Sequence, residues 1–225
     1  MIHTQLTVDD ISCPDRMDFM PRSLTLRQKQ GVESRERILD AAVDLIFENG
    51  YSGTSVAALC ARSALPASSI YWHFGSKDGV VAAVVKRESE RFFAELPTWE
   101  SSSSGGDVVE RFTRYMESVG AATREEPRFF RVLVTLAMEP VDISDDTIES
   151  IRRVRQSGLD FIAGPVSEVI AFLGSSKDPM EIATFCFAVL EGSAIGRRVD
   201  PEHISMPIVY RQIAQAAIAL ALAAD

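Results

Sequence analysis

The chain has 225 residues, enough for one medium-sized domain or two small ones, and 46% of them are hydrophobic, which supports a buried core. Glycine and proline number only 13 and 10, so the composition excludes collagen-like chains and Pro/Gly-rich disordered chains. Apolar residues recur at helical spacing while strand-like alternation is scarce, and this pattern predicts an all-α protein.

The net charge of −9 is distributed unevenly along the chain. Residues 1–15 carry three acids and no base, residues 16–96 carry eleven Lys and Arg against ten Asp and Glu, and residues 97–225 carry twelve against nineteen. The acidic excess therefore lies outside the segment 16–96, where it favours solubility and disfavours non-specific binding to nucleic acid.

The three cysteines, Cys13, Cys60 and Cys186, lie far apart and lack the spacing of a zinc site. The first twenty residues have no apolar core of the signal-peptide type. The apolar stretch at 213–224 is too short to cross a bilayer about 30 Å thick, so we read it as a buried packing helix. These observations predict a cytoplasmic protein without a membrane partner, a metal or a cofactor.

Residues 1–30 are expected to form a flexible arm whose second half is basic, with Arg22, Arg27 and Lys29. Such an arm is either a tail without a role or an element that contacts phosphates or the minor groove. A first helix is predicted from residue 33 or 34 to residue 49, and Gly50 ends it.

The segment 54–77 predicts two short helices joined by a tight turn, followed by the start of a third helix. Thr54 or Ser55 is placed to cap the first of them. Pro66 begins the second, which runs to about Phe74 and turns Ile70 inward. This arrangement is a helix-turn-helix.

The outward face of the second short helix carries small, hydroxyl, aromatic and imidazole side chains and no carboxylate: Ala67, Ser68, Ser69, Tyr71, Trp72 and His73. A helix of this width fits the major groove of DNA, and such a face meets phosphates and base edges without repulsion. Ser76 is placed to cap the next helix, and Lys77 stands in its first turn, where a cation and backbone N–H groups can hold a phosphate.

The chain resembles the TetR (tetracycline repressor) family of transcriptional regulators from Ser34 to about Val85. The resemblance rests on four motifs in order: Gly50-Tyr51, Thr54-Ser55-Val56, Tyr71-Trp72-His73-Phe74 and Ser76-Lys77-Asp78. It covers roughly a quarter of the chain. The chain departs from the family at Ala64, where glycine is usual in the turn, at Pro66, where serine usually caps the recognition helix, and at Ser68, where a glycine is common.

The resemblance implies three parts: the arm at 1–30, a helix-turn-helix DNA-binding domain at 31–80, and a helical ligand-binding and dimerisation domain at 81–225. In the first helix it implies that Arg35 contacts backbone phosphates. The residues expected to contact DNA are Arg35, Thr54, Ser55, Ala67, Ser68, Ser69, Tyr71, Trp72, His73 and Lys77.

Beyond the flexible SSSSGG connection at 101–106, helices are predicted at roughly 107–122, 126–139, 144–173, 178–197 and 203–223, punctuated by prolines. Their aromatic and Met side chains pack as an ordinary core or line an apolar cavity between helices. The resemblance implies an inducer site here, for an apolar or aromatic effector. The candidates are Phe93, Phe112, Tyr115, Met116, Phe129, Phe130, Met138, Phe161 and Phe185.

The last two helices are candidates for a dimer seam of four helices, two from each subunit. Small residues on the 178–197 helix permit close approach, although both helices can instead pack within one monomer. The resemblance implies the homodimer. The candidate interface residues are Gly192, Ser193, Gly196, Ile208, Ile213, Ala217 and Leu220.

No phosphate-binding glycine loop, metal-ligand spacing or nucleophile elbow occurs in the sequence, so we do not expect an enzyme. We expect a homodimeric DNA-binding regulator of transcription, a repressor that a ligand releases from a palindromic operator. The alternatives are an activator or global regulator of the same fold without an inducer, and a ligand-binding protein whose helix-turn-helix has decayed.

Overall fold

The computed structural model describes residues 25–100, 105–123, 128–138 and 143–223, and these residues form helices and connecting turns without a strand. The all-α prediction is confirmed. The helices are α1 (Leu26–Gly53), α2 (Val56–Ser63), α3 (Ala67–Phe74), α4 (Lys77–Glu95), α5 (Val108–Ala122), α6 (Arg128–Ala137), α7 (Asp145–Leu173), α8 (Pro179–Val199) and α9 (Met206–Leu222). Within these ranges, no helix has the length and apolar character that crossing a membrane would require.

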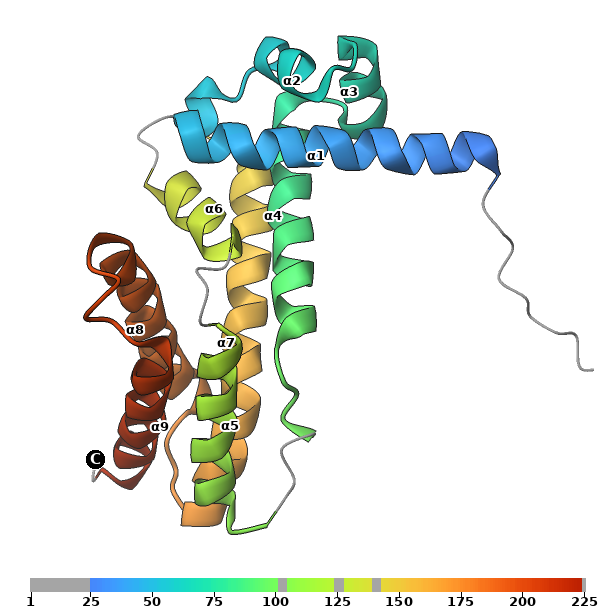
Figure 1. The fold of residues 1–225 in the computed structure, drawn as a ribbon. Coiled ribbons are helices and arrows are strands. Elements are labelled where there is room, and N and C mark those ends of the chain that lie inside the picture. The colour runs from blue at the N-terminus through green and yellow to red at the C-terminus, as the bar shows by residue number, and fades with distance from the viewer. Residues whose placement is uncertain (1–24, 101–104, 124–127, 139–142, 224–225) are drawn as a thin grey trace, which may run out of the picture.

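The head of the molecule is formed by α1, α2, α3 and the first half of α4 (Figure 1). Helix α1 lies across the top of α4, and the short pair α2 and α3 sits above it. Their apolar faces meet in one core, in which Ile38, Ile46, Leu59, Ile70 and Val84 are fully buried. The short helices α2 and α3 thereby share an interior with α1 and α4 that neither would have alone.

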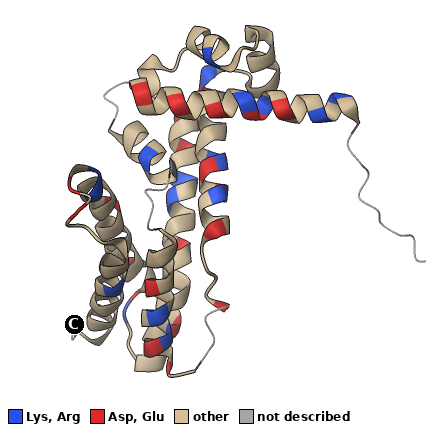
Figure 2. Ribbon diagram, in the orientation of Figure 1, with Lys and Arg blue, Asp and Glu red and all other residues tan. Residues whose placement is uncertain are grey.

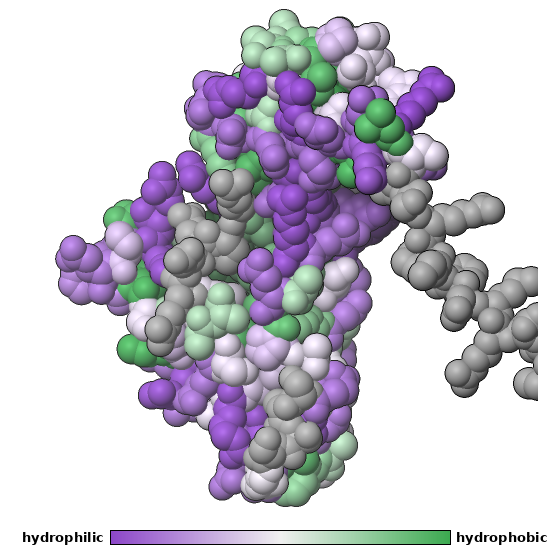
Figure 3. Space-filling model, turned by 45° about the vertical axis from the view of Figure 1, so that its right-hand side comes forward, coloured by the Kyte–Doolittle hydropathy of each residue, from purple (hydrophilic) through white to green (hydrophobic). Residues whose placement is uncertain are grey.

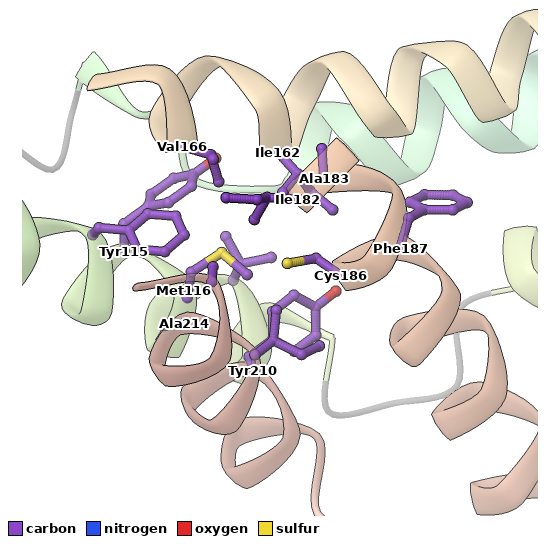
Figure 4. Packing of buried hydrophobic residues seen from close by; sticks show 14 of the residues in the cluster. Tyr115, Met116, Ile162, Val166, Ile182, Ala183, Cys186, Phe187, Tyr210 and Ala214 are labelled. Carbon is purple, nitrogen blue, oxygen red and sulfur yellow. The ribbon is translucent and has the colours of Figure 1, made fainter. Parts of the chain in front are cut away.

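The body is organised around the two long helices α4 and α7, which run side by side down the molecule (Figure 1). Helices α5, α8 and α9 pack against α7 and against one another. Their core contains Tyr115, Met116, Ile162, Cys186 and Tyr210 (Figure 4). Burial raises the pKa of the Cys186 thiol to about 11, which fits a core thiol that stays protonated.

Helix α6 is shared by the two cores. Val132 and Leu136 are buried in the core of the head, whereas Phe129 and Phe130 pack against Phe92 of the lower half of α4. Because α4 also passes through both cores, α4 and α6 together join head and body.

The predicted helices agree with the observed ones within a few residues, except at the start of α1. Thr25 and Gln28 form a capping box, in which each side chain accepts a hydrogen bond from the backbone N–H of the other. Helix α1 therefore starts at Leu26, not at residue 33 or 34, and residues 26–30 are helical rather than part of an arm. The rest of the predicted arm, residues 1–24, lies outside the described residues. Gly50, with a φ of 69°, breaks α1 before its last turn, at the residue predicted to end it.

The turn between α2 and α3 contains a left-handed residue. Ala64 has φ 54° and ψ 36°, the conformation for which glycine is usual in this turn. An L-residue in this region costs roughly 1–2 kcal/mol because its Cβ crowds its own backbone. Ala64 is exposed, so the cost at this position is one of local backbone strain.

We predict that Ala64→Gly raises the free energy of unfolding by about 0.5–1 kcal/mol, since relief of the left-handed strain exceeds the added entropy of the unfolded chain. Urea unfolding measures the change. Ala61→Gly is the matched control: this exposed position lies inside α2, where glycine should lower the free energy of unfolding by about 1 kcal/mol. A loss of stability in Ala64→Gly would contradict the prediction.

Candidate nucleic-acid interface

The helix-turn-helix is held in place by contacts from α1. The Ser55 side chain caps α2 by accepting from the backbone N–H of Ala58 at 3.1 Å. The guanidinium of Arg37 donates to the backbone carbonyl of Ser63 at 2.6 Å, at the end of α2. Arg62 forms a two-pronged ion pair with Glu48 of α1, at 3.0 and 2.6 Å. Both contacts from α1 lie at the C-terminal end of α2, beside the turn, and they fix the direction in which α3 leaves it.

Helix α3 buries one face and leaves the other in solvent. Ile70 is fully buried, and Phe74 is half-buried against the same core. On the opposite side Ser68 is exposed, Tyr71 is 53% exposed and Trp72 is 76% exposed. Such large aromatic side chains are usually covered in a folded protein, so their exposure side by side marks a binding surface.

Helices α2 and α3 carry no acidic side chain. No Asp or Glu occurs between residues 54 and 77. Figure 2 shows α2 and α3 without red, while acidic residues are spread along α1 and α4. In the space-filling view the top of the head is mostly pale or green rather than deep purple (Figure 3). This surface can approach a polyanion without like-charge repulsion.

His73 faces α1 rather than solvent. Its Nε2 lies 2.7 Å from the Ser34 hydroxyl of α1, and its ring meets the Trp72 ring edge-on at 4.4 Å. Burial, with the nearby Arg35 charge, lowers the pKa of His73 below its ordinary 6.5. The half-buried His73 therefore joins the end of α3 to α1, and its contact with DNA stays a prediction.

Thr54 and Lys77 are also engaged inside the head. Thr54 is fully buried, and its hydroxyl donates to the Gly50 carbonyl at 2.8 Å, so it cannot touch DNA and its assignment as a contact is wrong. The Lys77 ammonium donates to the Tyr51 carbonyl at 2.9 Å and lies 3.5 Å from the centre of the Tyr51 ring. The Tyr51 hydroxyl in turn donates to Asp78. Lys77 thus ties the start of α4 to the end of α1.

The other expected DNA contacts lie at or near the surface of the head. Ser55, Ser68, Tyr71 and Trp72 are exposed, while Ala67 and Ser69 are half-buried along α3. Arg35 is half-buried, with its guanidinium 5.3 Å from the Phe74 ring centre and 3.5 Å from Glu36. Ser76 caps α4 as predicted, accepting from the Gly79 N–H at 3.0 Å. The helix-turn-helix thus assembles a surface of polar and aromatic side chains on α3.

The aromatic residues of the body enclose a small cavity of about 20 Å³. Five of the nine candidate ligand residues line it: Phe93, Met116, Phe129, Phe130 and Phe161. Phe112 and Tyr115 are buried in the adjoining core, and burial raises the pKa of the Tyr115 hydroxyl. Met138 and Phe185 are 75% and 46% exposed, so they do not face this interior. Phe187, which is not among the nine candidates, also lines the cavity beside Gly158.

The candidate dimer residues divide between the core and the surface. Ile213 and Ala217 are buried within the monomer, so they are not interface residues of an exposed seam. Gly196 leaves room for Ile204 of the same chain, because a Cβ there would lie 2.7 Å from that side chain. Gly192, Ile208 and Leu220 are exposed, and Ser193 is half-buried.

An apolar stripe runs along the exposed side of α8, which the sequence analysis noted only at Gly192. Phe185, Ile195 and Val199 are 46%, 46% and 82% exposed. Phe185 and Val199 each lie seven residues from Gly192 and Ile195 lies three residues from it, which places all of them on one side of the helix. The described residues also contain no cluster of three His, Cys, Asp or Glu side chains suited to a metal.

Comparison with known proteins identifies the head. Residues 38–84 match the family model described as bacterial regulatory proteins, tetR family. The regulator UidR of Escherichia coli K12 is 34% identical over 69 residues, 31% of this chain and 35% of UidR. The repressor Rv3405c of Mycobacterium tuberculosis is 35% identical over 74 residues, 33% of this chain and 37% of Rv3405c. The alignments thus span about a third of the length of these curated relatives.

Solved structures match over most of the chain. A TetR-family regulator from Agrobacterium tumefaciens superposes with a TM-score of 0.63 at 19% identity, covering 83% of this chain and 98% of that protein. SmeT, the repressor of a multidrug efflux pump of Stenotrophomonas maltophilia, gives 0.58 at 24% identity, covering 84% and 88%, and a complex of SmeT with triclosan also matches. These likenesses show that head and body share one known fold.

The lowered pKa of His73 predicts a pH dependence of stability. Above its ordinary value of about 6.5 the ring is neutral in both states, and its contribution to stability is fully present. As the pH falls below 6.5, the unfolded chain takes up a proton that the folded ring resists, so the free energy of unfolding falls. Urea unfolding at pH 7.5 and pH 5.5 measures this loss.

We expect the loss between these two pH values to be smaller in His73→Gln, with the exposed His203→Gln as the matched control. An equal loss in His73→Gln and in the parent protein would contradict the burial of His73 at this joint.

Proposed function

We propose that this chain, a member of the tetR family of bacterial regulatory proteins, is a repressor that binds a palindromic operator as a homodimer and is released by a small effector. The observation that carries the proposal is the solvent-exposed, carboxylate-free face of α3 with Tyr71 and Trp72 side by side. Packing of the head does not require large aromatic side chains on this exposed face, so a binding function explains them better.

The face of α3 suits the major groove of DNA. Ala67 and Ser68 lie in its first turn, the end that enters deepest when a recognition helix docks. Tyr71 and Trp72 follow one turn later, where a hydroxyl can donate to a phosphate and an indole can pack on sugar or thymine methyl groups. Arg35, at the edge of the same surface, supplies a cation for the backbone. Ser55 and Ser69 complete the proposed contacts.

The exposed stripe on α8 supports the homodimer. A stripe of Phe185, Ile195 and Val199 on one helix is unusual for a monomer, because contiguous apolar surface is normally covered. Gly192, in the middle of the stripe, has open space around its Cα and permits a second helix to approach. Ile208 and Leu220 of α9 are exposed as well and extend the apolar surface to a second helix. A two-fold pair of such surfaces places two copies of α3 on successive turns of one palindrome.

The aromatic cavity supports a response to an effector. Its rings come from α4, α6 and α7, with Phe92 of α4 stacked on Phe129 of α6 at 5.1 Å between ring centres. At about 20 Å³ the cavity has room for little more than one water, so an effector has to part these rings. SmeT, of the same fold, has been solved with triclosan. A ligand that favours the parted arrangement shifts the population away from the DNA-binding conformer.

We predict that Trp72→Ala weakens binding to operator DNA at least tenfold, since loss of a base or sugar contact removes about 1–3 kcal/mol. Gel shift or fluorescence anisotropy with the DNA upstream of the protein's own gene measures the affinity. Phe172→Ala is the matched control, because Phe172 is 54% exposed but lies in the last turn of α7.

Equal affinity of the parent protein and Trp72→Ala would remove α3 as the reading helix. If the parent protein itself binds no DNA, the helix-turn-helix has decayed and the chain is a ligand-binding protein. Transcription of a reporter from the bound site then distinguishes a repressor from an activator.

We predict that Phe185→Glu dissociates the homodimer, since a charge placed in an apolar seam is desolvated without a partner. The dimer dissociation constant should rise at least tenfold, the scale of a lost aromatic anchor. Sedimentation equilibrium measures it, and Phe172→Glu provides the control for an added charge on an exposed aromatic. A monomeric parent protein, or an unchanged dimer in Phe185→Glu, would contradict the proposed seam.

A further inference from the structure

A cleft separate from the aromatic cavity opens where the C-terminal ends of α1, α6 and α8 converge (Figure 1). Its volume is about 260 Å³. Phe47 of α1, Val134 of α6, and Ile195 and Val199 of α8 form its apolar walls. We call it the α6–α8 cleft. Unlike the cavity, it is already open in this structure.

Two arginines face the α6–α8 cleft. The guanidinium of Arg131 lies 4.3 Å from the centre of the Phe47 ring, which holds it at the wall. Arg198 lines the opposite side, on α8. No carboxylate lines the cleft, and neither arginine forms an ion pair with a carboxylate in the described part of the chain.

Within the described residues, other arginines of the body form ion pairs with carboxylates, in contrast to Arg131 and Arg198. Arg155 of α7 pairs with Glu191 of α8 at 3.5 Å, and Arg211 of α9 pairs with Glu117 of α5 at 2.5 Å. In a chain of net charge −9, carboxylates are abundant, yet two guanidinium groups share an apolar cleft without one. The cleft is therefore complementary to an anion that brings its own apolar part.

We propose that the α6–α8 cleft binds a small monocarboxylate with a hydrocarbon tail. The carboxylate accepts hydrogen bonds from Arg131 and Arg198, since a planar guanidinium matches a carboxylate in two-pronged geometry. The tail lies along Val134, Ile195 and Val199, and its burial removes apolar surface from water. A volume of about 260 Å³ lies just below the range of drug-sized sites, so a short tail, such as that of octanoate, suits the cleft.

Occupation of the cleft would connect α8 to α1 and α6, which already pack together in the core of the head. Phe47 belongs to the helix that carries the head, and Ile195 and Val199 belong to the stripe on α8 that we propose as the dimer seam. Phe130 lines both the cleft and the aromatic cavity. An effect of the ligand on DNA binding rests on the proposed function. The binding itself does not, because it can be measured without DNA.

The test uses the full chain and isothermal titration calorimetry with octanoate, and octan-1-ol as the uncharged match. We expect octanoate to bind at least tenfold more tightly than octanol. Arg198→Gln should weaken octanoate at least tenfold and leave octanol unchanged, and so should Arg131→Gln. Arg152→Gln, an arginine 73% exposed on α7 and away from the cleft, is the matched control.

Since Arg131 packs on Phe47, thermal unfolding of each variant shows whether the fold is intact. Arg198 is exposed, so Arg198→Gln keeps the test decisive even if Arg131→Gln unfolds. Ile195→Glu, which puts a carboxylate into the cleft, should abolish octanoate binding. Phe185→Glu changes the α8 stripe outside the cleft and should leave octanoate binding intact. Because it should also dissociate the dimer, it shows whether Ile195→Glu acts through the cleft or through loss of the dimer.

Several outcomes would overturn the proposal. Octanoate binding that is unchanged in Arg198→Gln and Ile195→Glu would place the ligand elsewhere, in the aromatic cavity. Inorganic phosphate that competes as strongly as octanoate would show a plain anion site without a role for the apolar walls. Loss of octanoate binding in Phe185→Glu would show that the site needs a second copy of the chain. If octanoate binds as proposed but does not change DNA affinity, only the connection between the cleft and the head is refuted.

Discussion

The orientation of the head depends on one buried cation, the guanidinium of Arg87 on α4. The residue is only 7% exposed, and its guanidinium lies 3.0 Å from Glu36 and 2.9 Å from Asp40, both on α1. Its Nε donates to Glu88 of its own helix at 3.0 Å. A charge this deeply buried is stable only while its partners stay in place, and removing one of them typically costs about 3–5 kcal/mol. The network therefore specifies where α1 crosses α4. The face of α3 follows from that crossing, because Ser34 and His73 join α3 to α1.

Helix α4 provides a continuous connection between this joint and the body. Val80, Val81 and Val84 pack in the head, and two turns further along Phe92 and Phe93 enter the aromatic cluster. Arg87 lies between the two groups. Packed cores change between discrete arrangements rather than deforming continuously, so parting the rings around Phe92 displaces α4 as a unit. The proposed response to an effector thus needs no separate pathway. It needs only that the Arg87 network moves with α4, taking α1 and the reading helix along.

The sequence predicted the local elements well because their determinants are local. Helical spacing and the serine caps at Ser55 and Ser76 follow from a few neighbouring residues. The sequence did not predict which partner each side chain contacts. Thr54 and Lys77 looked like surface contacts, yet each is satisfied by a carbonyl of the α1 terminus. Ile213 and Ala217 carry the apolar spacing of a packing face, and spacing cannot say whether α5 of the same chain or a second copy covers it. The stripe on α8 and the unpaired arginines of the cleft became visible only once neighbouring helices were in place.

The aromatic cavity and the α6–α8 cleft differ in the free energy that binding would cost. The aromatic cavity is closed by ring contacts of 5.1–6.0 Å between Phe92, Phe93, Phe129 and Phe161, so any ligand must first separate rings that stabilise one another. The apparent affinity is then reduced by the small fraction of molecules in the open arrangement. The α6–α8 cleft is preformed, and binding there requires no such rearrangement. A ligand in the cavity must open the rings, and this opening both weakens its binding and produces its regulatory effect. A ligand in the cleft binds without opening the rings and acts only by holding α1, α6 and α8 together. If ligands bind at both sites, binding at one changes the affinity of the other through Phe130, the one ring that lines both.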